Sequence, residues 1–269
     1  MKRKKKNLTR KTTDQPKPLV KRIFNLKTLY AFVVISLIIL YPVYVSDGQK
    51  WTYVDSFGIK VPLRYTIHGI DVSHHNKKID WHKVKNSNDN VGVTFCFIKA
   101  TEGTDLKDQD FQNNWKEAKK VGLIRGAYHF YVPWADPILQ ANNFINTVSL
   151  DGGDFVPVVD FEVQGLNKKV RQKLVANVTT FIEHLKSHYG VDPIIYTNKH
   201  IYRQYIKGNF DDYPLWISDY DSRKLEGFES SRLMLWQHST NGRLDGISGD
   251  VDFNVFVASK SHLDDICVK

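Results

Sequence analysis

Two carboxylates separated by one residue follow a short apolar run in the middle of the chain. The run is Val156–Val159, and the acids are Asp160 and Glu162. Because side chains alternate along a β-strand, both acids should point to the same side, with their Cα atoms roughly 7 Å apart. Placing two acids beside an apolar run costs free energy unless something there uses them. The pair predicts either a catalytic site or a strand that simply ends in a solvated loop.

The elements that would position these acids come from an alternation of short apolar runs with helical stretches after Thr66. Such alternation favours βα units around a parallel sheet. The expected strands cover residues 67–72, 93–100, 124–131, 156–161, 193–196, 215–217 and 233–238, and the expected helices 108–121, 135–148, 167–189 and 198–206. These elements are few for a complete eightfold barrel. We therefore predict an α/β fold, a TIM-like β/α barrel that lacks some of its helices.

In such barrels the chemistry gathers at the carboxyl ends of the strands. Asp71 ends the first expected strand, and a last segment contributes Asp252. With Asp160 and Glu162 they would form a mouth of four acids, which favours the catalytic interpretation of the pair. Other strand ends carry candidates for substrate binding: Tyr128, Tyr196, Lys99, Trp216 and Gln237. The aromatic residues among them, and Trp236, offer flat faces to sugar rings, with core packing as the alternative role of each.

Several carboxylates beside aromatic side chains suit glycoside hydrolysis, in which one acid protonates the leaving oxygen. An ionised Asp160 would raise the pKa of Glu162 by like-charge repulsion and keep Glu162 protonated as the general acid. The sequence lacks G-x-S-x-G, H-E-x-x-H, Walker and G-x-G-x-x-G patterns, and it has no metal-binding cysteine spacing. We therefore expect neither a metal ion nor another cofactor.

The basic character of the chain is confined to its amino-terminal part. Residues 1–27 hold eleven Lys and Arg against the single Asp14, a net charge of +10, whereas the whole chain carries +9. Residues 28–269 therefore carry a net charge of −1. A folded part without excess positive charge is not expected to bind nucleic acid.

An uncharged stretch follows the basic residues, from Thr28 to Val45. Its eighteen residues are long enough to cross a bilayer as a helix. The cationic flank predicts a cytoplasmic amino terminus, with everything after the stretch outside the cell membrane. A cleaved signal peptide is the competing interpretation, but no small-x-small cleavage site follows.

The expected organisation places a basic cytoplasmic tail at 1–27, a transmembrane signal anchor at 28–45, a spacer at 46–65, the catalytic domain at 66–259 and a C-terminal tail at 260–269. Two cysteines lie in the exported part. Cys96 and Cys267 can pair in an oxidising compartment, but Cys96 equally well fits a small buried hydrophobe. Both possibilities stay open.

Eight motifs follow one another along the exported part: Gly69–Asn76 with Ile79–Trp81, Phe97–Gly103, Gly126–Phe130, Pro157–Glu162, Ile195–Thr197, Leu215–Ile217, Leu235–Gln237 and Val251–Phe256. In type, order and spacing they resemble the family 25 glycoside hydrolases, the Chalaropsis-type lysozymes or N-acetylmuramidases. The resemblance covers roughly residues 66–258. One departure is Lys77-Lys78, where family members often carry glycine at the edge of the groove.

The resemblance implies a flattened barrel of eight strands and about five helices. It implies cleavage of the β-1,4 bond between N-acetylmuramic acid and N-acetylglucosamine in peptidoglycan glycan strands. Glu162 matches the general acid, and Asp160 matches a carboxylate that orients the substrate's own acetamido group as the nucleophile, one of the exceptions to the two-carboxylate scheme. Asp71 and Asp252 match the other acids of the cleft, and Tyr128 and Tyr196 match its tyrosines.

Two other functions remain open at this point. A catalytically inactive, membrane-tethered wall-binding protein would have the same fold, although the presence of all four acids counts against it. A peptidoglycan hydrolase of different bond specificity, an N-acetylglucosaminidase or an amidase, is the other. In each case we expect an exported domain that is monomeric and a chain that contacts the bilayer through residues 28–45.

Overall fold

A computed structural model describes residues 29–36, 50–87, 91–163, 166–222, 224–225, 228 and 232–269. The chain divides into two compact units, Met1–Gly48 and Gln49–Lys269. In the first unit residues 29–36 are helical, and the rest of the predicted tail and anchor lies outside the described residues. Over the described ranges, no helix combines the length and the apolar character that crossing a bilayer requires.

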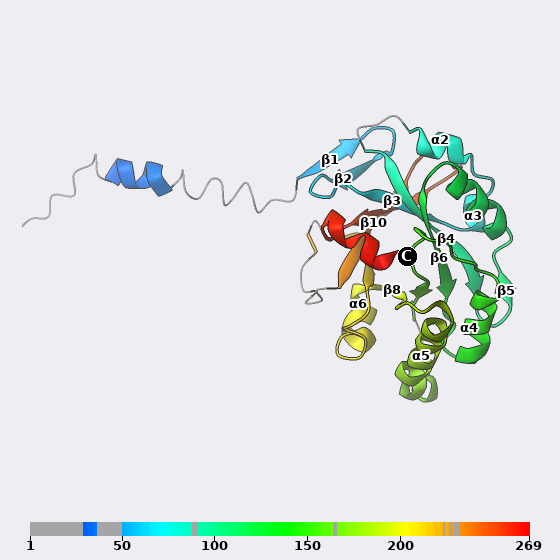
Figure 1. Ribbon diagram of the computed structural model, residues 1–269. Helices are drawn as coiled ribbons and strands as arrows, with labels where there is room; N and C mark the ends of the chain where they lie inside the picture. Colours follow the sequence, from blue (N-terminus) through cyan, green and yellow to red (C-terminus); the bar gives the residue numbers. More distant parts are fainter. Residues whose placement is uncertain are drawn as a thin grey trace, which may run out of the picture. The chain divides into compact units, whose positions relative to one another are not determined.

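The second unit is an α/β barrel closed by eight strands (Figure 1). They are β3 (His68–Val72), β4 (Val93–Glu102), β6 (Ile124–Phe130), β7 (Val158–Asp160), β8 (Ile194–Asn198), β9 (Leu215–Ser218), β10 (Leu233–Gly242) and β11 (Val251–Phe256). Their order around the barrel is β3-β11-β10-β9-β8-β7-β6-β4, and the pairing of β3 with β4 closes it. The short strand β5 (Leu106–Lys107) pairs with the end of β4. The predicted barrel is confirmed.

Strand β11 runs antiparallel to both of its neighbours, β10 and β3, whereas the other neighbouring strands of the barrel are parallel. The amino end of β11 therefore lies beside the carboxyl ends of the other strands. As a result, Asp252 near the start of β11 is the register partner of Asp71 on β3. An antiparallel neighbour needs no helical crossover, which explains part of the shortage of helices.

The helices lie around the outside of the barrel (Figure 1). They are α2 (Trp81–Lys85), α3 (Phe111–Lys120), α4 (Pro137–Ile145), α5 (Lys168–Tyr189) and α6 (Lys199–Ile201), which continues into a π-helical turn, Tyr202–Ile206. The helix predicted over 167–189 is α5. The Asn167 side chain caps its start, and Gly190, at a φ of 71°, ends it. Helix α2 was not predicted, because five residues are too few to show a helical period.

Apolar side chains fill the barrel interior, and a second apolar cluster lies between the sheet and the helices. In the interior, Phe97 stacks on Phe155 and Trp216, with ring centroids 4.8 and 4.4 Å apart. Its register partner on β6 is Gly126, and a Cβ atom there would lie 2.4 Å from the Phe97 ring. The strands are thus apolar on both faces, which accounts for their near-continuous apolar runs.

An antiparallel hairpin precedes the barrel and departs from the spacer expected over 46–65. It consists of β1 (Trp51–Val54) and β2 (Ile59–Pro62). Phe57 at its turn is fully buried and its ring lies 4.7 Å from that of Phe253 on β11. Gly58 provides the φ of 63° that the turn requires. Residues 51–62 are therefore an integral part of the barrel unit.

The last residues also depart from the expectation of a tail over 260–269. Leu263 and Ile266 are buried in the interior cluster, and the carbonyl of Ile266 accepts a hydrogen bond from the Val156 amide at 3.0 Å. This segment closes the amino-terminal end of the barrel; it is drawn in red in Figure 1. Cys267 lies in it and is a free thiol, as is the buried Cys96. The disulfide that the sequence left open is not formed.

We expect Gly126→Ala to destabilise the barrel by about 1–3 kcal/mol, since the added methyl group must displace the Phe97 ring. The measurement is the free energy of unfolding in denaturant. Gly92→Ala is the matched control, because it removes the same backbone freedom but nothing lies within 4 Å of the new Cβ atom. Equal stability of the two variants would show that the glycine does not make room for Phe97.

Candidate active site

The four predicted acids line one cavity of about 310 Å³ at the carboxyl end of the barrel. Asp71 comes from β3, Asp160 from the end of β7, Glu162 from just beyond it, and Asp252 from β11. All five candidates for substrate binding line it as well: Tyr128, Tyr196, Lys99, Trp216 and Gln237. The domain also has cavities of about 600 and 710 Å³, and none of the four acids lines either of them.

Alternation along β7 delivers the central pair. Val158 and Asp160 face the interior, whereas Val159 and Phe161 belong to the cluster on the helix side. The Phe161 amide donates to the Tyr196 carbonyl at 2.8 Å, and the Thr197 hydroxyl donates to the Phe161 carbonyl at 2.8 Å. These bonds hold the backbone extended past Asp160, so that the next inward side chain enters the same cavity.

Asp71 is held by two side-chain amides. Gln237 Nε2 and Asn254 Nδ2 each donate to Asp71 Oδ2 at 2.7 Å. Hydrogen bonds to the two amide oxygens fix the orientation of both amides. The Tyr196 hydroxyl donates to Gln237 Oε1 at 2.7 Å, and Trp216 Nε1 donates to Asn254 Oδ1 at 2.9 Å. The carboxylate therefore has satisfied hydrogen bonds even though it is buried.

The environment raises the pKa of all four acids. Burial is the main cause in each case, because it disfavours the charged form. The pKa of Asp252 rises to about 9, since burial adds to the negative charge of Asp71 opposite. For Asp160, burial acts together with the charges of Glu162 and Asp71 to raise the pKa well above its usual value. For Glu162, the nearby Tyr196 hydroxyl partly opposes the rise. The cluster as a whole therefore retains protons near neutral pH.

The order of ionisation within the central pair differs from the one expected from the sequence. Asp160 is the more deeply buried of the two, and its Oδ1 atom has no hydrogen-bond partner among the described residues. Burial alone thus resists a negative charge on Asp160 more strongly than one on Glu162. An ionised Asp160 beside a protonated Glu162 requires an additional donor at that oxygen.

The tryptophans do not act as exposed platforms. Trp216 is 2% exposed, and it forms the floor of the cavity while stacking on Phe97. Trp236 is fully buried and does not line the cavity; its ring lies 5.5 Å from that of Trp51. Of the two roles that the sequence left open for these residues, Trp236 therefore has core packing, and Trp216 contributes to the cavity from beneath.

Tyr220 was missed by the sequence analysis. It lines the cavity, is 49% exposed, and donates a hydrogen bond to Gln237 Oε1. It lies two residues beyond the end of β9, so the rule that strand ends carry function would have found it. Ser73, His75 and Phe130 also line the cavity without having been singled out.

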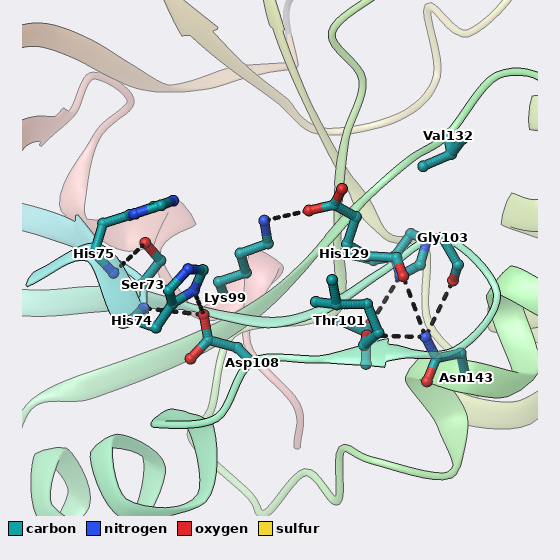
Figure 2. Close-up of polar contacts among 12 residues, drawn as sticks. Ser73, His74, His75, Lys99, Thr101, Gly103, Asp108, His129, Val132 and Asn143 are labelled. Atoms are coloured by element: carbon teal, nitrogen blue, oxygen red, sulfur yellow. Dashed lines mark hydrogen bonds and ion pairs between the residues drawn. The ribbon is translucent and has the colours of Figure 1, made fainter. Parts of the chain in front are cut away.

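Polar contacts fix the loops that border the cavity (Figure 2). His74 Nδ1 lies 2.7 Å from Asp108 Oδ2, which also accepts from the His74 amide at 2.9 Å. Lys99 Nζ forms an ion pair with Glu102 Oε2 at 2.7 Å, and its charge opposes the rise in the pKa of Asp160. In the loop that begins at His74, Lys77 adopts a φ of 57°, which favours glycine.

Within the described ranges, no group of three or more His, Cys, Asp or Glu side chains is arranged to hold a metal ion.

Comparisons with known proteins give one family. Residues 70–247 match the sequence profile of glycosyl hydrolases family 25. An uncharacterized protein of Escherichia coli, YegX, is 41% identical over 204 residues, covering 76% of this chain and 74% of that protein. Lysozyme M1 of Streptomyces globisporus is 33% identical, covering 73% and 70%. The solved structure of a family 25 glycosyl hydrolase from Bacillus anthracis has a TM-score of 0.68 at 31% identity, covering 76% of this chain and 95% of that one.

The raised pKa of Asp252 predicts how stability depends on pH. Between pH 7 and 8.5 an unfolded Asp carries no proton, whereas folded Asp252, with a pKa of about 9, still holds one. Unfolding then releases a proton, so the free energy of unfolding falls as pH rises, by about 1.4 kcal/mol per pH unit for each such proton. Asp252→Asn should make this slope shallower. Buried histidines add only a small opposing contribution near pH 7, because His68 and His129, with folded pKa values of about 4, are neutral in the folded state and an unfolded His is mostly neutral above its usual pKa of about 6.5.

The measurement is denaturant unfolding at several pH values across that window. Asp245→Asn, on an exposed side chain of the loop before β11, is the matched control and should keep the wild-type slope. If Asp252→Asn also keeps it, Asp252 does not carry the proton.

Proposed function

The chain belongs to family 25 of the glycosyl hydrolases, and we propose that it cleaves the β-1,4 bond between N-acetylmuramic acid and N-acetylglucosamine while anchored in a membrane. The family and its relatives establish that the chain is a glycoside hydrolase of the lysozyme, or muramidase, class. The bond, the residue roles and the anchor are the proposal. The observation that carries the residue roles is the buried Oδ1 atom of Asp160, which has no hydrogen-bond partner among the described residues and lies beside Glu162 in a cavity of four acids.

Glu162 acts as the general acid. Burial raises its pKa and so favours the protonated form, and it is partly exposed in the cavity, so a glycosidic oxygen can reach it. Proton transfer from Glu162 to that oxygen accompanies cleavage of the bond between the oxygen and the anomeric carbon. The resulting carboxylate then accepts a proton from the water that completes hydrolysis.

Asp160 positions the nucleophile. An acetamido N–H of the substrate supplies the donor that Asp160 Oδ1 lacks among the described residues. This hydrogen bond stabilises the Asp160 anion, leaves the proton on Glu162, and aims the acetamido oxygen at the anomeric carbon. The order of ionisation that burial disfavours in the free enzyme is thus produced by the substrate itself.

Asp71 and Asp252 complete the site. Being register partners on neighbouring strands, they share a proton, which reduces the negative charge beside the reacting pair. Gln237 and Asn254 hold Asp71 in place, and the two tyrosines that meet at Gln237 Oε1 hold that amide. This arrangement keeps the sugar-facing acids in fixed positions before substrate binds.

The inactive wall-binding protein is disfavoured, because an inactive relative has no reason to keep four acids together in a buried cavity at a cost in free energy. A hydrolase of different bond specificity is separated by the chemistry of the product. We expect that wall digested by the full chain and then reduced with borohydride yields muramitol as the new sugar end. Glucosaminitol instead would show an N-acetylglucosaminidase, and no new sugar end would show an amidase or an inactive protein.

Glu162→Gln should lower the rate of end formation by about 10³-fold, because it removes the proton donor. Glu117→Gln on α3, whose carboxylate does not line the cavity, is the matched control and should retain the wild-type rate. Full activity of the Glu162 variant would contradict the assigned role.

The membrane part of the proposal rests on sequence. The uncharged residues 28–45 act as an uncleaved signal anchor, the basic residues 1–27 stay in the cytoplasm, and the catalytic domain acts outside as a monomer on peptidoglycan strands. An anchored enzyme acts only on wall within reach of the bilayer.

We expect the full chain, expressed in bacteria, to remain in the membrane pellet after washing with alkaline carbonate and to be released by detergent. A chain that lacks residues 1–45 should remain soluble after synthesis. The mass of the membrane-bound protein should include residues 1–27. A mass that lacks the first 45 residues or so would identify a cleaved signal peptide and overturn the anchor.

A further inference from the structure

A second cavity lies beside the catalytic one, under the hairpin of β1 and β2. The hairpin precedes residues 70–247, the part that matches the family profile. It is fixed to the barrel by the Phe57 ring on Phe253 and by a hydrogen bond of 2.8 Å from the Arg243 amide to the Phe57 carbonyl. Its strands thus form a wall next to the carboxyl end of β10, on the side of the barrel where Tyr220 also lines the catalytic cavity.

The cavity between this wall and the barrel has a volume of about 710 Å³. That is within the range of sites for organic ligands. Tyr220 lines both this cavity and the catalytic one, and its hydroxyl donates to Gln237 in the latter. The two cavities are therefore neighbours that share one side chain.

The lining combines aromatic faces with neutral polar groups. Tyr53 on the hairpin and Tyr220 opposite are 56% and 49% exposed. Thr240 and Asn241, at the end of β10, contribute a hydroxyl and an amide. Aromatic faces surrounded by neutral hydrogen-bonding groups match a sugar ring, which has apolar faces and a rim of hydroxyls.

His238 adds a buried polar group at the same place. It lines the cavity, is 5% exposed, and neither of its ring nitrogens has a hydrogen-bond partner among the described residues. Burial lowers its pKa to about 3, so the ring is neutral and offers one donor and one acceptor. The ring is part of the cavity wall, and both of its nitrogens are covered in this structure.

We propose that this cavity is an additional glycan subsite, built by the hairpin, that binds sugars of the same strand beyond those in the catalytic cavity. The inference rests on the proposed function, which makes the ligand a long glycan strand. A stem peptide of the wall, which carries carboxylates, is the less suitable occupant, because the charges of Lys60 and Asp221 in the lining offset each other.

The test measures binding of glycan chains of four and eight sugars, freed of stem peptides, to the full chain carrying Glu162→Gln, so that no hydrolysis occurs. Calorimetry should give a lower Kd for eight sugars than for four. In that background Tyr53→Ala should raise the Kd for eight sugars roughly five- to tenfold and leave that for four sugars within about twofold. Tyr53→Phe, which keeps the aromatic face, should restore most of the affinity.

Leu63→Ala is the matched control, because Leu63 is an exposed apolar residue just after β2 that does not line the cavity. It should change neither Kd. An unchanged Kd for eight sugars in Tyr53→Ala, or an equal loss for both lengths, would overturn the inference. A loss seen only with glycans that still carry stem peptides would identify the peptide as the occupant and overturn it too.

A separate assay tests the proposed function: hydrolysis of the four-sugar chain by the protein with native Glu162. Absence of that hydrolysis refutes the function, whereas the difference in binding between the two lengths still decides the subsite.

Discussion

Four carboxyl groups share one buried cavity, and the free-energy cost of placing negative charge there governs how the surrounding structure is built. No described cation is buried among them as a full counterion, and the Lys99 ammonium is paired with Glu102. Neutral donors take that role instead, through the amides of Gln237 and Asn254 on Asp71. Protons that the carboxyl groups retain lower the remaining negative charge. Burial of these groups therefore raises their pKa values instead of being compensated by ion pairs.

The direction of one strand, β11, brings an acid and a neutral donor to this cavity. Because β11 is antiparallel, Asp252 lies opposite Asp71, and Asn254 two residues on faces the same side and reaches the same carboxylate. A parallel strand would have brought its opposite end to the mouth. The stacked rings of Phe97 and Trp216 beneath the acids exclude water from below, so that substrate approaches from one side.

The sequence predicted those parts of the molecule that depend on local period. Strand alternation placed Asp160 and Glu162 on one side, and the rule for strand ends gathered the four acids and most of the lining. It missed what depends on tertiary contacts. The two strands of the hairpin have only four residues each, which is too short to show a period, and the hairpin is buried through contact with Phe253, almost two hundred residues later. Residue type alone does not predict whether the Trp236 ring is buried or exposed. It also does not predict which of two neighbouring acids is more deeply buried.

The two ends of the barrel sequence meet in space. Asp71 on the first strand of the barrel accepts a hydrogen bond from Asn254 on the last, 183 residues away, and the segment around Ile266 closes the opposite end of the barrel. A chain emerging from the ribosome therefore cannot complete its sheet until β11 has been made, because β3 has no partner on that side before then. The four acids can therefore come together only after β11, which carries Asp252, has been synthesised. A chain truncated in its last twenty residues would leave the barrel open.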